Sequence, residues 1–257
     1  MRSSINFDNK LIMVSQMKND STFQMLEYDR LKGIGDYNIA STINNINESG
    51  ARLKQVRIIL EDSSVKVEPG AISYIRGNIE LINNRNKALS LGKKIISNKF
   101  SNEVIEDKPV YGGEGEIFLE PSFQHYAFIE LEDEEIIIDD GLFLACEEGV
   151  DVKTVINGRK YEIVLSGEGI VVIELPVPAD EVFKCKIYND TLKVDGDFVL
   201  LRGGNIDHTV EQSALVSGNG LLNVYSGIGD IWLVPTQPIY KSIVDNNSTN
   251  NYPEEDY

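Results

Sequence analysis

One short pattern occurs three times along the chain, and such a recurrence constrains the fold more than any local motif does. The three segments are Val65–Gly70 (VKVEPG), Ile136–Gly141 (IIIDDG) and Leu192–Asp197 (LKVDGD). Adding one fixed number to the residue numbers of the first segment gives the second, and adding another to those of the second gives the third, with no gap inside the segments. We call these numbers the first and the second shift. The first shift takes position 65 to 136, and the second shift takes position 136 to 192. The match continues downstream to Ile79, Val150 and Ile206, so the pattern predicts one supersecondary unit that is used three times.

Most of the chain has the composition of short β-strands. Runs rich in Val, Ile, Phe and Tyr, such as Arg57–Leu60, Tyr161–Leu165 and Asp230–Val234, are separated by Gly, Asp and Asn. The separators recur at intervals of roughly 8–12 residues, which is typical of all-β proteins. A parallel α/β sheet would need helices between its strands. The expected fold class is therefore all-β, as a β-sandwich, a barrel or a β-helix-like stack.

One segment departs from this pattern. Residues 86–100 place Ala88, Leu91 and Ile95 at helical spacing, which predicts a short amphipathic helix. An insertion of that length also explains why the first shift is longer than the second. We expect an N-terminal extension (1–24), one three-repeat β domain (25–244) and a disordered acidic tail (245–257). The expected repeats cover residues 25–85, 100–157 and 158–240.

The charge of the chain is strongly negative and unevenly distributed. The formal net charge is −17, and residues 101–151 hold 16 acidic side chains against one basic side chain, Lys108. The preceding segment, residues 83–100, holds five basic side chains and no acidic one. The two segments could neutralise each other, within a subunit or between subunits, or form two solvated faces. Nucleic acid is an unfavourable partner, because its binding depends on Lys and Arg neutralising phosphates.

Five Gly-x-Gly elements occur, at residues 33–35, 113–115, 167–169, 218–220 and 227–229. A phosphate-binding loop of the dinucleotide type would need a third glycine and a following helix. None of the five provides either in sequence. Tight turns between strands, which require positive φ, explain them better.

No arrangement of residues with catalytic spacing is present. His125 and His208 lie far apart in the chain, and we expect ordinary surface or turn histidines. Cys146 and Cys185 show no metal-type spacing and are expected to be reduced and packed as small apolar residues. The acidic run at residues 130–135 lacks the spacing of a calcium loop and predicts a solvated hairpin tip, with weak cation binding as the alternative. We therefore assign no catalytic, cofactor-binding or metal-binding residue and expect no cofactor.

The N-terminal segment lacks the apolar core of a signal peptide. No apolar run approaches the roughly 20 residues that a membrane-spanning helix needs. We expect a cytoplasmic protein that does not span a membrane.

Four segments together resemble a known family. They are the D-G-x-x-L-A strand and acidic turn (139–150), two S-G-x-G turns (165–169 and 217–221) and a G-x-G-x-I-W-L strand (227–233). In this order they resemble the altered-inheritance-of-mitochondria family, whose bacterial members are mostly uncharacterised. The resemblance covers roughly residues 25–238. It implies three repeats similar to the tryptophan RNA-binding attenuation protein, in a double-stranded β-helix-like stack.

These observations favour a non-catalytic β scaffold or adaptor over an enzyme. We expect a homo-oligomer, with a trimer favoured because it would bring nine repeats together, and an unidentified protein partner. A small-molecule-binding module is the alternative, by analogy with the amino-acid pockets of the attenuation protein. RNA binding and enzyme activity are further alternatives with less support.

Overall fold

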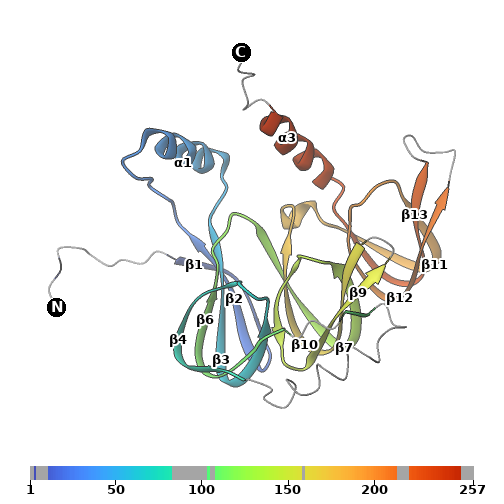
Figure 1. Cartoon of the computed structure of the whole chain (residues 1–257), viewed down its shortest axis with the longest axis horizontal. Coiled ribbons are helices and arrows are strands. Elements are labelled where there is room, and N and C mark those ends of the chain that lie inside the picture. The colour runs from blue at the N-terminus through green and yellow to red at the C-terminus, as the bar shows by residue number, and fades with distance from the viewer. Residues whose placement is uncertain are drawn as a thin grey trace, which may run out of the picture.

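The computed structural model describes residues 3, 11–82, 103–104, 108–157, 160–212 and 220–249. The strands in this part of the chain form one connected antiparallel sheet of 13 strands (Figure 1). The predicted all-β class is confirmed. The attenuation-protein-like stack that the resemblance implies stays a prediction.

The sheet begins earlier in the chain than the sequence indicated. Strands β1 (Leu11–Lys18) and β2 (Ser21–Tyr28) form a hairpin, and β2 pairs with residues 54–60 of β3. Residues 11–18 and 21–24 of the extension expected over residues 1–24 therefore belong to strands of the sheet. Ser21, Thr22 and Phe23 are buried there, which explains why this hairpin belongs to the domain.

Helix α1 (Tyr37–Ser49) follows the hairpin and was not expected from the sequence. The side chain of Asp36 accepts a hydrogen bond of 3.0 Å from the backbone N–H of Ile39 and so caps the first turn. Gly50 ends the helix in a left-handed conformation, with φ of 81°. No residue of α1 is buried, and the helix stands away from the sheet (Figure 1).

The remaining strands form three groups, in each of which the last long strand lies in the middle. The first group is β3 (Lys54–Val67), β4 (Ile72–Leu81) and β6 (Val110–Leu119). The second group is β7 (His125–Asp139), β8 (Phe143–Glu147), β9 (Val150–Asn157) and β10 (Lys160–Leu175). The third group is β11 (Phe183–Val194), β12 (Val199–Gln212) and β13 (Leu221–Leu233). The short elements β5 (Glu103–Val104), which pairs with β9, and η1 (Ala179–Glu181) complete the sheet region.

A β-bulge recurs in the first strand of each group. The bulged residues are Asp62, Asp133 and Asn189, with φ of 60°, 57° and 50°. The first shift takes position 62 to 133 and the second takes 133 to 189, so the bulges recur with the same spacing as the sequence pattern. A bulge of this kind increases the local twist, so each group bends at the corresponding place.

Three of the Gly-x-Gly elements lie opposite these bulges, in the middle of β6, β10 and β13. The prediction that they are turns between strands is wrong for these three. A Cβ on Gly113 would lie 2.2 Å from the carbonyl oxygen of Asn78, and one on Gly227 would lie 2.1 Å from that of Asn205. Glycine is required because two bent strands approach each other there. The element at 33–35 precedes α1, and most of the element at 218–220 lies outside the described residues.

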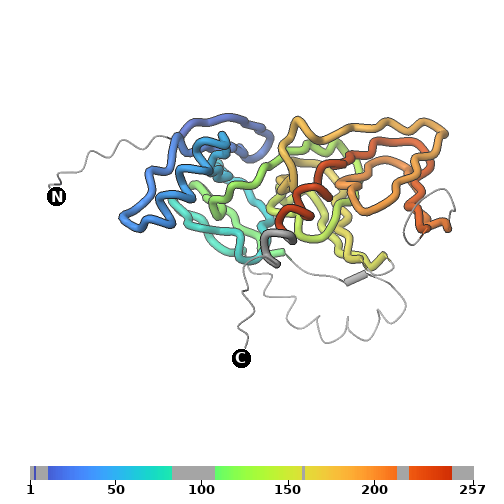
Figure 2. The backbone as a smooth tube through the Cα atoms, turned by 90° about the horizontal axis from the view of Figure 1, so that it is seen from above, coloured from blue at the N-terminus to red at the C-terminus, as the bar shows by residue number. Residues whose placement is uncertain are grey.

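Two short ladders join the groups to one another. Residues 65–67 of β3 pair with residues 145–147 of β8, and residues 136–138 of β7 pair with residues 201–203 of β12. Both ladders are short and antiparallel. Two of the three apolar clusters cross these junctions: one contains Ala145 and Val172 of the second group beside first-group residues, and another contains Leu200 and Leu201 of the third group beside second-group residues. Figure 2 shows the three groups following one another along the long axis of the molecule.

The C-terminal helix α3 (Gln237–Thr249) extends past the expected start of the tail at residue 245. Residues 250–257 lie outside the described residues, and so do residues 86–100, for which a helix was expected.

Candidate functional site

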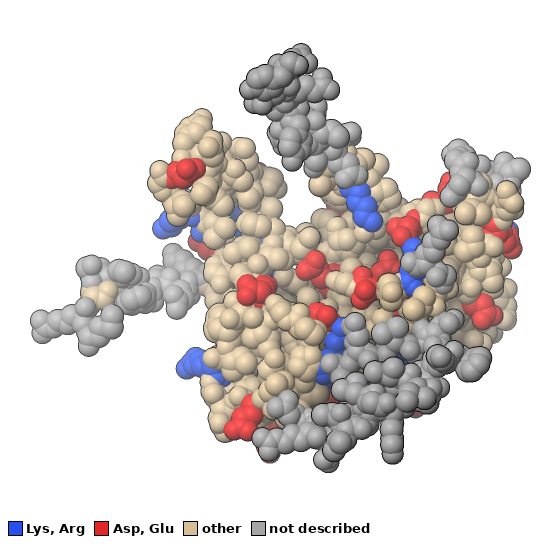
Figure 3. All heavy atoms as spheres, in the orientation of Figure 1, with Lys and Arg blue, Asp and Glu red and all other residues tan. Residues whose placement is uncertain are grey.

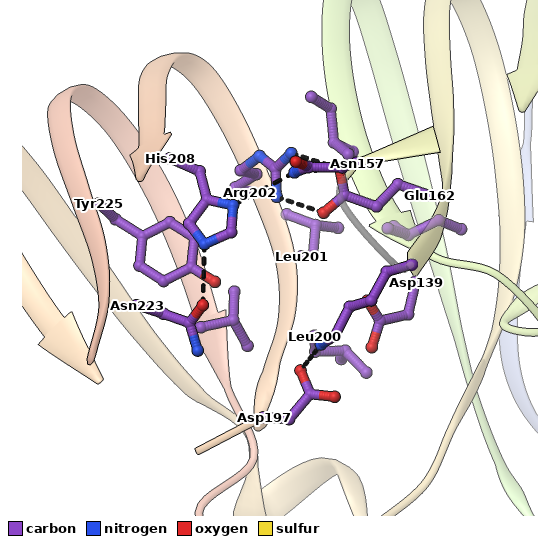
Figure 4. Close-up of a pocket in the computed structure, with 14 residues that line it drawn as sticks. Asp139, Asn157, Glu162, Asp197, Leu200, Leu201, Arg202, His208, Asn223 and Tyr225 are labelled. Carbon is purple, nitrogen blue, oxygen red and sulfur yellow. Dashed lines mark hydrogen bonds and ion pairs between the residues drawn. The ribbon is translucent and has the colours of Figure 1, made fainter. Parts of the chain in front are cut away.

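A cluster of polar side chains lies where the second group meets the third (Figure 4). At its centre, the Arg202 guanidinium on β12 donates two hydrogen bonds, of 2.8 and 2.6 Å, to the Glu162 carboxylate on β10. The two side chains are only 11% and 7% exposed. A bidentate pair of this kind fixes both the distance and the relative orientation of its strands.

Two asparagines and one histidine extend the cluster across the junction. Asn157 Nδ2 donates to Glu162 Oε2 at 3.1 Å and lies 3.2 Å from His208 Nδ1. His208 Nε2 lies 2.9 Å from Asn223 Oδ1, and Asn223 Nδ2 donates to the carbonyl oxygen of Gly196 at 2.8 Å. With Asn157 Nδ2 donating to Nδ1, the ring donates from Nε2 to Asn223 Oδ1. The ring also stacks on Tyr225, with centroids 4.6 Å apart.

Burial and the charge of Arg202 together control the protonation of the cluster. Burial raises the pKa of Tyr225 to about 12, so the phenol stays neutral. Burial also raises the pKa of Asp139, against the opposing charge of Lys160, which itself pairs with Asp197. For Glu162, burial opposes ionisation, but the Arg202 hydrogen bonds and charge outweigh it and hold the pKa below its usual value.

The space left within the cluster is small. Its volume is about 30 Å³, enough for a water molecule or two. Cavities that bind organic ligands have volumes of roughly 300–1,000 Å³. The side chains are bonded mainly to one another, so the chemistry this arrangement can perform is to hold two strand groups together.

A larger groove runs beside the cluster, between β7 and the β12–β13 pair. Its volume is about 610 Å³. Acidic side chains of β7 and the aromatic ring of Trp232 line it, and Lys184 at its edge pairs with Asp230 at 3.0 Å.

Within the described residues, the edge of β7 that borders this groove is open, whereas the corresponding edge of β3 in the first group is covered by the N-terminal hairpin. Glu130 and Leu131 line the groove at positions that the first shift relates to Ile59 and Leu60. In the first group Ile59 and Leu60 pair with β2. The groove therefore occupies the place that the N-terminal hairpin takes in the first group.

At the other junction, a buried carboxylate takes the place of an open groove. Glu147 Oε1 accepts from the Ser21 backbone N–H at 2.7 Å, and Oε2 accepts from the Ile170 N–H at 2.9 Å. The Asn19 side chain adds a third hydrogen bond of 3.1 Å. The carboxylate thus fastens the β1–β2 hairpin over the first junction.

A third cavity, of about 590 Å³, lies beneath α3 and is mainly apolar. Phe123, Pro178 and Val244 line it, and the Tyr240 hydroxyl at its edge donates to Glu181 at 2.7 Å. Burial, together with the positive charge of Lys54, lowers the pKa of His125 in its wall. His125 is therefore a neutral, partly buried side chain rather than an exposed turn residue.

The residues considered in the sequence take up quite different environments. His208 was expected to be an ordinary surface or turn histidine. It is partly buried in the polar cluster and contacts Asn223. Cys146 lies in the core, and burial raises its pKa to about 12, as expected for an inert thiol; Cys185 is partly buried and free. The acidic run 130–135 lies inside β7, so its placement at a hairpin tip was wrong.

Among the described residues, no group of three or more His, Cys, Asp or Glu side chains converges as a metal site would require. The acidic side chains of residues 130–135 instead line the groove or face solvent. Figure 3 shows acidic side chains spread over the face seen in Figure 1, with fewer basic side chains among them.

Fold and site together define a β protein in which a buried Arg–Glu pair joins the second strand group to the third. Comparison with known proteins identifies the family. The family model described as Mitochondrial biogenesis AIM24 matches residues 46–236, and the chain belongs to this family. Its recognition from the four sequence segments is therefore confirmed.

The fold has a counterpart among solved structures. A crystal structure of a protein from Streptococcus pyogenes, determined by a structural genomics consortium, is 18% identical in sequence. The similarity covers 76% of this chain and 94% of that chain, with a TM-score of 0.55. No curated protein matches the chain. Within the described residues, neither helix has the length and apolarity needed to cross a bilayer.

Proposed function

We propose that the chain is a non-catalytic, self-associating β scaffold. The observation that carries this proposal is the mutual hydrogen bonding within the polar cluster between the second and third groups. Arg202, Glu162 and His208 each bond to another side chain across the junction, which supports a structural role for them. Their arrangement serves to fix one strand group against the next.

Exposed apolar side chains provide the surfaces that such a scaffold would use. Helix α1 exposes Tyr37 and Ile39, and α3 exposes Ile239 and Ile243. Both helices project from the same side of the sheet (Figures 1 and 3). Large exposed apolar surfaces are typical of protein-binding sites. The helices are therefore the elements that a protein partner would contact.

Light scattering on the purified chain tests self-association. The single chain has a mass of 28.7 kDa, and we expect a multiple of this mass at micromolar concentration, with dissociation on dilution. A trimer is the assembly we favour. A mass of 28.7 kDa at every concentration tested would contradict the proposal.

A small-molecule site in the groove is the second candidate function. The volume of about 610 Å³ lies in the range of ligand pockets. The lining favours a cationic ligand, because Glu130, Glu134 and Glu135 contribute carboxylates to it. Trp232 lines the groove and is the only tryptophan in the sequence, so its fluorescence reports on occupancy.

Titration with spermidine, followed by Trp232 fluorescence, tests this second candidate. A saturable change that is lost in the Glu130→Gln/Glu135→Gln variant would support it. A linear response that is the same in both proteins would exclude a specific site for polyamines. Titration with putrescine is the matched control for charge, because it carries fewer ammonium groups.

A further inference from the structure

Two strands at opposite ends of the molecule have one unpaired edge each. Within the described residues, β4 pairs only with β6, and β11 pairs only with β13. They belong to the first and the last group and lie at opposite ends of the long axis (Figures 1 and 2). An unpaired edge is a template for another strand.

The two ladders that join the groups inside the chain indicate which residue of β11 would lie opposite which residue of β4. In the first ladder Lys66 lies opposite Cys146, and in the second Ile137 lies opposite Arg202. The first shift relates Lys66 to Ile137, and the second shift relates Cys146 to Arg202.

One further application of the shifts to each pair of equivalent positions leads to a residue on an unpaired edge. The second shift takes position 137 forward to Lys193, and the first shift, reversed, takes position 146 back to Ile75. Lys193 lies on β11 and Ile75 lies on β4. Lys193 and Ile75 therefore occupy the positions that a third ladder of the same kind would use.

The backbone of β4 is oriented to form this ladder. The Ile82 N–H donates to the carbonyl oxygen of Val110 at 2.8 Å, and the register is regular from there back to Tyr74. Residues that hydrogen-bond to a given neighbour alternate in an antiparallel ladder. The N–H and C=O of Ile75 are therefore directed away from β6, toward the open edge. Ile75 is 40% exposed and its neighbour Tyr74 is 48% exposed.

The backbone of β11 has the matching orientation. The Thr191 N–H donates to its neighbour's side chain, Asp190 Oδ1, at 2.7 Å, so it is directed away from β13. By the same alternation, the N–H and C=O of Lys193, two residues further, are also directed outward. Both central residues of the third ladder therefore present their hydrogen-bonding groups to the outside.

The side chain at the Lys193 position is compatible with pairing. In the first ladder, Lys66 Nζ reaches across the junction and donates to the carbonyl oxygens of Glu148, at 2.8 Å, and of Val150. The equivalent carbonyls beyond the third ladder are those of Gly77 and Ile79. Lys193 pairs with Glu211 on a half-exposed surface, which leaves its ammonium able to exchange partners.

We propose that copies of this chain join head to tail, with β11 of one copy pairing antiparallel with β4 of the next and Lys193 opposite Ile75. This deepens the proposed function, because it rests on self-association and names its surfaces. A head-to-tail contact closes into a ring if its rotation permits and otherwise extends as a filament.

Disulfide cross-linking tests the register. Leu192 and Arg76 would face each other as a non-hydrogen-bonded pair, at a Cα separation of about 4.5 Å, which a disulfide can span. The test protein carries Leu192→Cys and Arg76→Cys in a Cys185→Ser background, and Cys146 is kept because it is buried. After oxidation we expect a ladder of linked multimers on a non-reducing gel. The matched control carries Ile75→Cys in place of Arg76→Cys, which moves the thiol to the other face of β4.

The outcomes separate the register from self-association. A ladder from the test protein, and none from the control or from either single variant, supports the proposal. Multimers in light scattering without a ladder, or equal ladders from test and control, overturn the register and leave self-association standing. A monomer without a ladder overturns both. Circular dichroism confirms that each variant is folded, and the Arg76 side chain is 80% exposed, so its replacement removes little packing.

Discussion

The ion pair between Arg202 and Glu162 holds the second and third strand groups together at the scale of single residues. We expect Arg202→Met to lower the free energy of unfolding by about 3–5 kcal/mol at pH 7, because it leaves a buried carboxylate without a partner. Urea denaturation measures the change. The double variant Arg202→Met/Glu162→Gln is expected to lose less, since no buried charge remains.

The pH dependence of the same variant provides a second check. In the wild type the lowered pKa of Glu162 stabilises the fold above its unfolded value of about 4.3, and this contribution is lost as the pH falls through the folded pKa. Without Arg202, burial raises the pKa of Glu162, so protonation of this carboxylate removes the cost of a buried, unpaired charge. The deficit of Arg202→Met should therefore shrink between pH 7 and pH 4.5. An equal deficit at both pH values would show that the charge is not its cause.

Gly227 tests the close approach of β12 and β13. We expect Gly227→Ala to destabilise the protein by more than the roughly 1–3 kcal/mol of a strained φ, because the added Cβ would also meet the carbonyl oxygen of Asn205. Gly141→Ala is the matched control, since Gly141 has a φ of 87° but an added Cβ there would have no other atom within 4 Å. Equal losses of thermal stability in the two variants would contradict the close-approach explanation.

At the scale of elements, helix α1 depends on its caps rather than on burial. We expect Asp36→Ala to reduce its local stability by about 1 kcal/mol through loss of the N-cap. Amide exchange over residues 37–49 should accelerate about fivefold, while exchange in β3 stays unchanged. Asp29→Ala, an exposed change in the same connection, is the control and should leave both rates unaltered.

The elements also show what the sequence could and could not predict. The strands could be predicted because runs rich in β-branched residues that alternate with polar residues are typical of a sheet with one buried face. Helix α1 was missed because its Asn- and Ser-containing sequence has low helix propensity, and only Asp36 and Gly50 mark its ends. The Gly-x-Gly elements were misplaced because a turn and a close strand approach both favour glycine.

The polar cluster could not be predicted from local spacing. Asn157, Glu162, Arg202 and Asn223 lie on four different strands, and only the pairing register brings them together. Only the threefold recurrence of the sequence pattern gave information beyond local structure. The three bulges recur with the same two shifts.

At the scale of the whole molecule, the arrangement of three strand groups in a row leaves a matching edge at each end. Amide hydrogen exchange on the wild-type chain tests this account most directly. The reference amides are those of Lys66 and Cys146, which pair inside the chain. We expect the Ile75 and Lys193 amides to be protected at high concentration and to lose protection on dilution, while the reference amides stay protected. Fast exchange at Ile75 and Lys193 in a sample that light scattering shows to be multimeric would contradict it.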